Sequence, residues 1–176
     1  MRRWPAIFAA VLLLGALAGS AAIEIAPPDF REIAWPFPRD GWPAGRAFRC
    51  RGGKCEGIEI YVRPKLGFCN CDSGVADDDE VDRVSDLDLI SARFAPLSPG
   101  EPIRATDMSG RVRAYELQMP DEARHTAVGI AVSYRCDLFV AVAQGAAAAG
   151  DVQAAAAGLL ETNEIRRWVQ SAMQMR

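Results

Sequence analysis

The sequence contains a single histidine, His125, and lacks the short motifs that mark most catalytic and cofactor sites. It has no Cys-x-x-Cys pair, the usual motif of thiol–disulfide oxidoreductases, and no Cys-x-x-Cys-His that would attach a haem. Nothing resembles a nucleophile elbow. A lone imidazole without a partner group does not define a hydrolase, so we expect His125 in a polar turn before a strand. No cofactor is expected.

An excess of positive charge is also absent. The chain has 20 Lys and Arg residues against 23 Asp and Glu. Nucleic acids and anionic membrane surfaces attract proteins with a basic surface, so neither is expected as a partner. Beyond residue 22 no apolar run approaches the roughly 20 residues that span a bilayer, and we expect no stable membrane insertion there.

The N-terminus is the one long apolar part of the chain. Arg2 and Arg3 precede a short apolar stretch, and small residues follow from Ala18 to Ala22. This pattern is typical of a secretory signal peptide that is cleaved after Ala22. We therefore expect residues 1–22 to be a signal peptide and the rest of the protein to be periplasmic or secreted.

Proline and aromatic residues are concentrated in the next segment, residues 23–45. Proline fixes the backbone in an extended form and prevents a helix, so an extended arm is expected here. The side chains of Trp35, Phe37 and Trp42 either pack over the core or form an exposed patch that binds a protein partner. Residues 46–176 have the length of a single domain.

Several short apolar segments of this domain predict strands, and residues 58–62 alternate apolar and polar side chains as a half-buried strand does. A turn is expected at residues 51–54, and Arg63-Pro64-Lys65 is expected to interrupt the strands. The expected strands cover residues 47–50, 58–62, 66–71, 103–106, 112–119, 126–133 and 137–143.

Helices are expected in the middle and at the end of the chain. Asp77 and Glu80 have the spacing of a capping box and predict a helix start, whereas residues 86–94 fit a helix or a strand. A helix is expected from Asp151, with a cap at Thr162 or Asn163 before a second, amphipathic piece. Strands first and helices last indicate an α+β domain with an antiparallel sheet, a capped mid-chain helix and a C-terminal amphipathic helix.

Five cysteines give an odd number of thiols in a chain that is expected to enter an oxidising compartment. Two stapling disulfides and one free thiol are therefore expected among Cys50, Cys55, Cys69, Cys71 and Cys136. Cys50 and Cys55 flank the turn at 51–54, which places them opposite each other at disulfide distance. Cys136 then pairs with Cys69 or Cys71. In the alternative, Cys50 and Cys55 pair with Cys69 and Cys71, and Cys136 is free.

The closely spaced Cys69 and Cys71 also have an interpretation as a metal site, because two thiolates suit Cu(I) or Zn. Zinc sites usually combine two separated Cys or His pairs, which this sequence lacks. A metal-handling accessory protein that uses the thiolates of Cys69 and Cys71 is thus an alternative function and not the favoured one. An enzyme that uses thiol–disulfide exchange or His125 is a second alternative.

The string from Tyr61 to Cys71, with Asp82-Arg83-Val84 and Arg135-Cys136-Asp137 after it, resembles small exported proteins of alphaproteobacteria that have no assigned activity. The resemblance covers most of the chain after the signal and implies no catalytic residues. Without a catalytic constellation, the sequence favours an exported binding or accessory module that acts on a protein partner.

Overall fold

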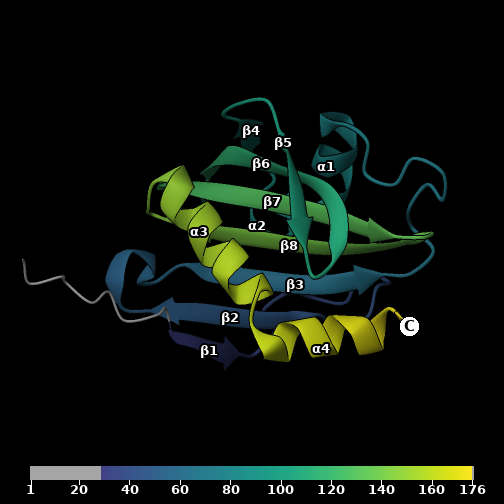
Figure 1. Ribbon diagram of the computed structural model, residues 1–176. Helices are drawn as coiled ribbons and strands as arrows, with labels where there is room; N and C mark the ends of the chain where they lie inside the picture. Colours follow the sequence, from purple (N-terminus) through teal and green to yellow (C-terminus); the bar gives the residue numbers. More distant parts are fainter. Residues whose placement is uncertain (1–28, 176) are drawn as a thin grey trace, which may run out of the picture.

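Eight strands form one antiparallel sheet in the computed structural model, which describes residues 29–175 (Figure 1). The strand order is β1-β2-β3-β8-β7-β6-β4, and β5 pairs with β6. The α+β class with disulfides is thus confirmed. The strands are β1 (Asp29–Ile33), β2 (Arg46–Arg51), β3 (Glu59–Lys65), β4 (Phe94–Pro96), β5 (Glu101–Ala105), β6 (Met108–Gln118), β7 (Arg124–Tyr134) and β8 (Asp137–Gly145).

Helices cover both faces of this sheet. The two C-terminal helices, α3 (Ala149–Leu160) and α4 (Asn163–Ala172), cross the face that is turned to the viewer in Figure 1. The shorter helices, α1 (Asp78–Val84) and α2 (Leu87–Ile90), pack on the opposite face. A turn of 3-10 helix, η1 (Gly53–Cys55), lies between β2 and β3.

The face under α3 and α4 carries the larger apolar core. Alternate strand residues such as Ile60, Val62 and Ile130 point to it and are fully buried. The predicted amphipathic helix is confirmed, because Ile165 and Val169 of α4 are also buried there. Burying each such side chain contributes about 1.5–3 kcal/mol. The Thr162 hydroxyl accepts a hydrogen bond from the Ile165 N–H and caps α4, as its position predicted.

The mid-chain helix also begins where the sequence predicts. The Asp77 carboxylate accepts a hydrogen bond from the Glu80 N–H at 2.9 Å and caps α1. Val81 and Val84 of α1 pack against the opposite face of the sheet. Residues 86–94 are expected to form a helix or a strand, and they contain both: α2 covers Leu87–Ile90, and β4 begins at Phe94.

Part of the expected arm belongs to the sheet. Residues 29–33 form β1, which pairs with β2 from Asp29 opposite Arg51 to Ile33 opposite Ala47. Only residues 34–45, which we call the strap, leave the sheet and cross its α1–α2 side. The expected signal peptide at residues 1–22 lies outside the described residues.

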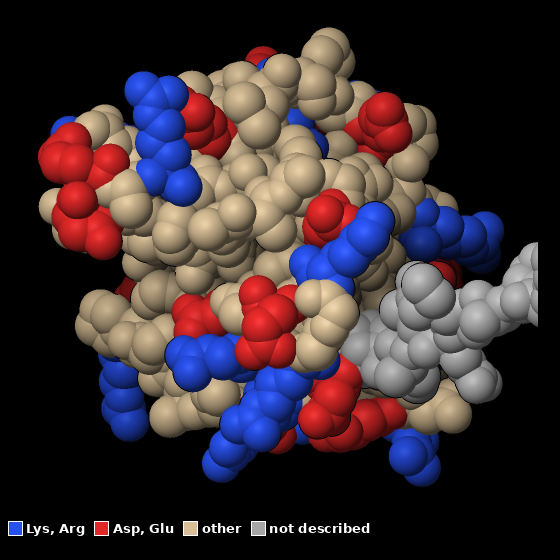
Figure 2. Space-filling model, turned by 90° about the vertical axis from the view of Figure 1, so that its left-hand side faces the viewer, with Lys and Arg blue, Asp and Glu red and all other residues tan. Residues whose placement is uncertain are grey.

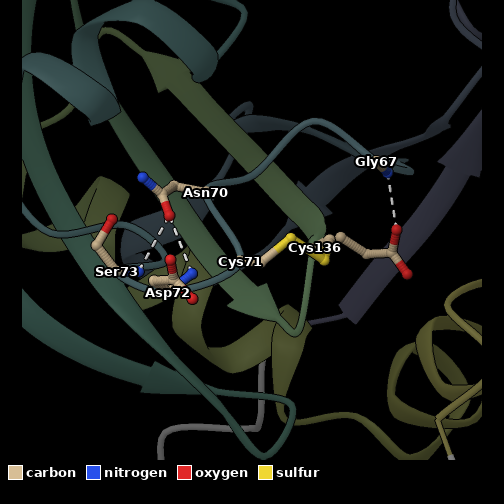
Figure 3. Close-up of a disulfide and its surroundings, with 7 residues drawn as sticks. Gly67, Asn70, Cys71, Asp72, Ser73 and Cys136 are labelled. Carbon is tan, nitrogen blue, oxygen red and sulfur yellow. Dashed lines mark hydrogen bonds between the residues drawn. A yellow bond between two sulfur atoms is a disulfide. The ribbon is translucent and has the colours of Figure 1, made fainter.

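The expected strand at residues 66–71 is wrong. Residues 66–71 are not a strand, because the chain turns at Gly67 with a φ of 70°. The Asn70 side chain then accepts hydrogen bonds from the N–H groups of Asp72 and Ser73, which holds a second turn (Figure 3). A side-chain amide that bonds to the following backbone favours a turn over a strand.

The expected interruption at Arg63-Pro64-Lys65 is also wrong, because β3 continues through Pro64 to Lys65. Pro64 lies opposite Phe139 of β8. The pairing with β2 ends at Val62, so β3 has a strand on only one side at Pro64. Proline is tolerated in such an edge position because its missing N–H removes no sheet hydrogen bond on the open side.

Candidate functional site

Four of the five cysteines are joined in disulfides. Cys50 pairs with Cys55 across the β2–β3 connection with a Cα separation of 5.7 Å, the pairing that the turn spacing predicted. Cys71 pairs with Cys136 and ties the turns after β3 to the β7–β8 turn (Figure 3). Because Cys71 is in a disulfide, it cannot bind a metal ion as a thiolate. Within residues 29–175, no group of three or more His, Cys, Asp or Glu side chains could hold a metal ion.

Cys69 is the free thiol, and it is half-buried. Its side chain packs beside the small apolar cluster of α1 and β8. Burial raises the pKa of this thiol, because removal from water disfavours the thiolate. Cys69 is therefore a weak nucleophile at neutral pH.

The side chains of β3 that point away from α3 and α4 form a polar row. Glu59, Tyr61, Arg63 and Lys65 are two residues apart, so they share the face that meets the strap and α2. Arg63 and Lys65 are only 2% and 4% exposed. Charged side chains at this depth need partners of opposite charge.

The connection between α1 and α2 supplies the main partner, Asp86. Its carboxylate accepts hydrogen bonds from Nε (2.6 Å) and Nη2 (2.7 Å) of Arg63 and from Nζ of Lys65 (2.6 Å). Lys65 also donates to the carbonyl of Val84 at 2.8 Å. Asp86 has a φ of 61°, a left-handed conformation that Asp tolerates better than most residues. The connection thereby places this carboxylate between the two cations.

The strap supplies a second carboxylate, that of Asp40. Nη1 and Nη2 of Arg63 donate to its two oxygens at 3.0 and 2.7 Å, a bidentate pair. The hydrogen bonds from Arg63 lower the pKa of Asp40 to about 2. Burial lowers the pKa of Arg63, but its hydrogen bonds to Asp86 and Asp40 outweigh that effect and raise it. We call Arg63, Lys65, Asp86 and Asp40 the buried ion cluster.

Aromatic rings of the strap enclose the buried ion cluster. Trp35 and Phe37 meet the ring of Tyr61 edge-on, with centroid separations of 6.2 and 4.7 Å. Trp42 meets Phe68 in the same way at 5.0 Å. Trp35, Phe37 and Trp42 are each half-buried, so part of each side chain packs on the fold and part remains accessible. The rings thus pack over the fold, as one alternative predicts, with part of each left at the surface.

His125 lies within β7 and not in the expected polar turn before it. Its Nδ1 is hydrogen-bonded to Oε1 of Gln144. Gln144 donates in turn to Glu59, which also accepts from the hydroxyl of Tyr61. Burial, and then the hydrogen bond to Glu59, raise the pKa of Tyr61. The only histidine is therefore linked through an amide to the end of the β3 row.

Two arginines of β6, Arg111 and Arg113, converge on α1. Arg111 donates to Asp78 at 2.6 Å, and Arg113 donates to Asp82 at 2.9 Å. The buried Tyr115 also donates its hydroxyl to Asp82 at 2.7 Å. These acids therefore hold α1 on the sheet.

Sequence reasoning missed the buried ion cluster. The available signal was that Arg63 and Lys65 continue the alternation of Glu59 and Tyr61. The proline between the two cations obscured that signal, and nothing local marks Asp86 as their partner.

Comparisons with known proteins add no functional information. No family model matches the chain, and no curated protein matches it. Among solved structures, a Pseudomonas aeruginosa protein of unknown function, described as a putative regulator, aligns at 11% identity with a TM-score of 0.34, over 85% of this chain and 81% of that one. No helix of the described chain is long and apolar enough to cross a membrane.

Proposed function

We propose that the protein is an exported, non-enzymatic interaction module that binds a protein partner through the strap side of its sheet. The half-burial of Trp35, Phe37 and Trp42 carries this proposal, because rigid aromatic rings that are held in place yet accessible are typical of interface anchors. Further half-buried apolar side chains, Ile90 and Phe94, border the cluster against which Trp35 and Phe37 pack. We call Trp35, Phe37, Trp42, Ile90 and Phe94 the strap face.

Surface charge supports a protein partner over a nucleic acid. Lys and Arg side chains alternate with Asp and Glu on the side of the molecule shown in Figure 2, around an area of uncharged residues. Nucleic-acid binding requires a concentration of positive charge. The side of the molecule in Figure 2 shows no such concentration, which argues against a nucleic-acid partner there.

The two disulfides support the proposed location outside the cytoplasm, since disulfides persist in oxidising compartments. The proposed processing can be tested by mass spectrometry of the protein isolated from the periplasm or the medium. We expect a mature chain that begins at Ile23. A chain that still starts at Met1 would contradict export by a cleaved signal.

Partner binding is tested by replacing strap-face residues. An affinity-tagged protein with Ile90→Ser and Phe94→Ser, two strap-face residues outside the strap itself, is compared with the Leu97→Ser variant after crosslinking in the native compartment. Leu97 is 54% exposed and lies outside the strap face, so it controls for the loss of exposed apolar surface. We expect the strap-face variant to lose its crosslinked partner and the Leu97 variant to keep it. Equal retention by two folded variants would refute the proposed surface.

A further inference from the structure

Side chains alone hold the strap on the fold. No backbone hydrogen bond joins residues 34–45 to any other part of the described chain. Pro36, Pro38 and Pro43 lack an N–H and cannot extend the sheet. The Trp42 N–H donates to the Asp40 carboxylate, a bond within the strap itself. The strap therefore lies on the sheet as a bound extended peptide would.

Charge balance beneath the strap depends on Asp40. Arg63 and Lys65 carry two positive charges, whereas Asp86 alone supplies one negative charge from the body of the fold. Asp40 supplies the second, and its own side chain remains 27% exposed. If the strap moved away, a buried cation would lose its counter-charge, an unfavourable state that another carboxylate can relieve.

We propose that the strap is an internal ligand, which occupies a binding site for an extended partner segment that combines a carboxylate with flanking aromatic side chains. The partner carboxylate takes the place of Asp40 on Arg63, and its aromatic rings take the places of the strap rings against Tyr61 and Phe68. This inference rests on the proposed interaction function: the partner first meets the accessible strap rings together with Ile90 and Phe94, and its segment then replaces the strap on β3.

The chemistry of the occupant follows from the groups that the strap uses. The guanidinium of Arg63 presents two parallel N–H groups to Asp40, a geometry that matches a planar carboxylate. Lys65 lies near the rings of Trp42 and Phe68, at 5.9 and 5.7 Å from their centroids, so an aromatic side chain beside the carboxylate gains a cation–π contact. A close backbone approach at Gly45, beside the Val62 carbonyl, favours a slender extended chain.

Displacement requires competition with an attached ligand. A tethered segment acts at an effective concentration of about millimolar, so an external peptide binds weakly while the strap is in place. Weakening the strap without removing Arg63 should therefore increase the affinity for an added peptide.

The test uses a labelled synthetic peptide of residues 33–45 and the full mature protein, with binding followed by fluorescence anisotropy. We expect the Asp40→Asn protein to bind this peptide at least about tenfold more tightly than the wild-type protein does. The Asp88→Asn protein, altered at an exposed acid of α2, should behave as wild type. A peptide that carries Asp40→Asn should lose at least about tenfold in affinity for the Asp40→Asn protein.

A second variant guards against a strap that stays bound through its rings. Asp40→Asn combined with Trp42→Ala removes both the carboxylate and one ring contact. Failure of both folded variants to bind millimolar peptide would overturn the proposal, as would equal binding of the two peptides. If Asp40→Asn protein instead dimerises on size-exclusion chromatography by exchanging straps, the occupant is a second copy and the partner assignment is overturned.

The outcome is separable from that of the proposed function. Absence of peptide exchange, together with loss of the crosslinked partner in the strap-face variant, would leave the interaction function standing and refute only the internal ligand. Peptide exchange without any crosslinked partner would show that the strap can be replaced by an added segment, and it would refute the proposed partner-binding function.

Discussion

The backbone N–H of Cys69 donates a hydrogen bond to the carbonyl of Cys136 at 3.1 Å, although the disulfide of Cys136 goes to Cys71. The free cysteine and the bonded one thus both lie beside Cys136. The two partners that the sequence allows for Cys136 are thus both its neighbours in the fold.

Removing Cys71 should redirect the disulfide. In Cys71→Ala, we expect Cys69 to pair with Cys136, because the backbone already holds these two residues side by side. Peptide mapping by mass spectrometry without reduction checks the new bond, and thiol counting should then find no free cysteine. Cys69→Ala, the matched control, should keep the Cys71–Cys136 bond. Two free thiols in folded Cys71→Ala would contradict the prediction.

Asp86 should be a major determinant of stability. Replacing it with Asn leaves Arg63 and Lys65 buried with insufficient negative charge, so we expect a loss of about 3–5 kcal/mol in the free energy of unfolding. Urea denaturation measures this loss. The exposed neighbour Asp88 provides the control, since Asp88→Asn should change the value by no more than about 0.5 kcal/mol. A similar small change for Asp86→Asn would show that the cluster relaxes or admits water.

Acid should weaken the contact between the strap and the sheet. The pKa of Asp40 is lowered from 3.8 to about 2 in the folded protein. Because the folded value is the lower one, the contribution of Asp40 to stability is complete above the unfolded pKa and disappears as the pH falls through the folded pKa. The difference in unfolding free energy between wild type and Asp40→Asn should therefore be constant at neutral pH and shrink between about pH 4 and pH 2. A difference that is unchanged at pH 2 would contradict the ion pair.

Gly45 should tolerate no side chain. A Cβ at this position would lie 2.2 Å from the Val62 carbonyl oxygen and 2.7 Å from the Trp35 ring. We expect Gly45→Ala to cost about 1–3 kcal/mol in thermal or urea unfolding, because the backbone or the strap must move. Gly150→Ala is the control: nothing lies within 4 Å of its added Cβ, and Ala favours the helix there. Equal stability of the two variants would mean that the strap yields freely.

Much of the fold could be predicted because its signals are local. The continuous apolar runs of β7 and β8, the cap at Thr162 and the apolar stripe of α4 each depend on residues only a few positions apart. The bond between Cys50 and Cys55 closes a short loop, so spacing alone brings these cysteines together.

The candidate site could not be predicted because its parts come from distant segments. Arg63 is separated by 23 residues from both Asp40 and Asp86, and no local pattern links them. Alternation along β3 predicts one buried face and one face toward solvent. The strap and α2 cover that second face, so its polar side chains are buried as well.

The pairing of β3 with β8 has a consequence for how the chain acquires its structure. Glu59 lies opposite Gln144, so the sheet cannot join its two halves until nearly the whole polypeptide is present. The covering helices α3 and α4 are later still in the sequence. Long-range pairing of this kind slows folding. A chain with this strand order therefore emerges from the ribosome without a completed core, and its sheet closes only after synthesis has reached β8.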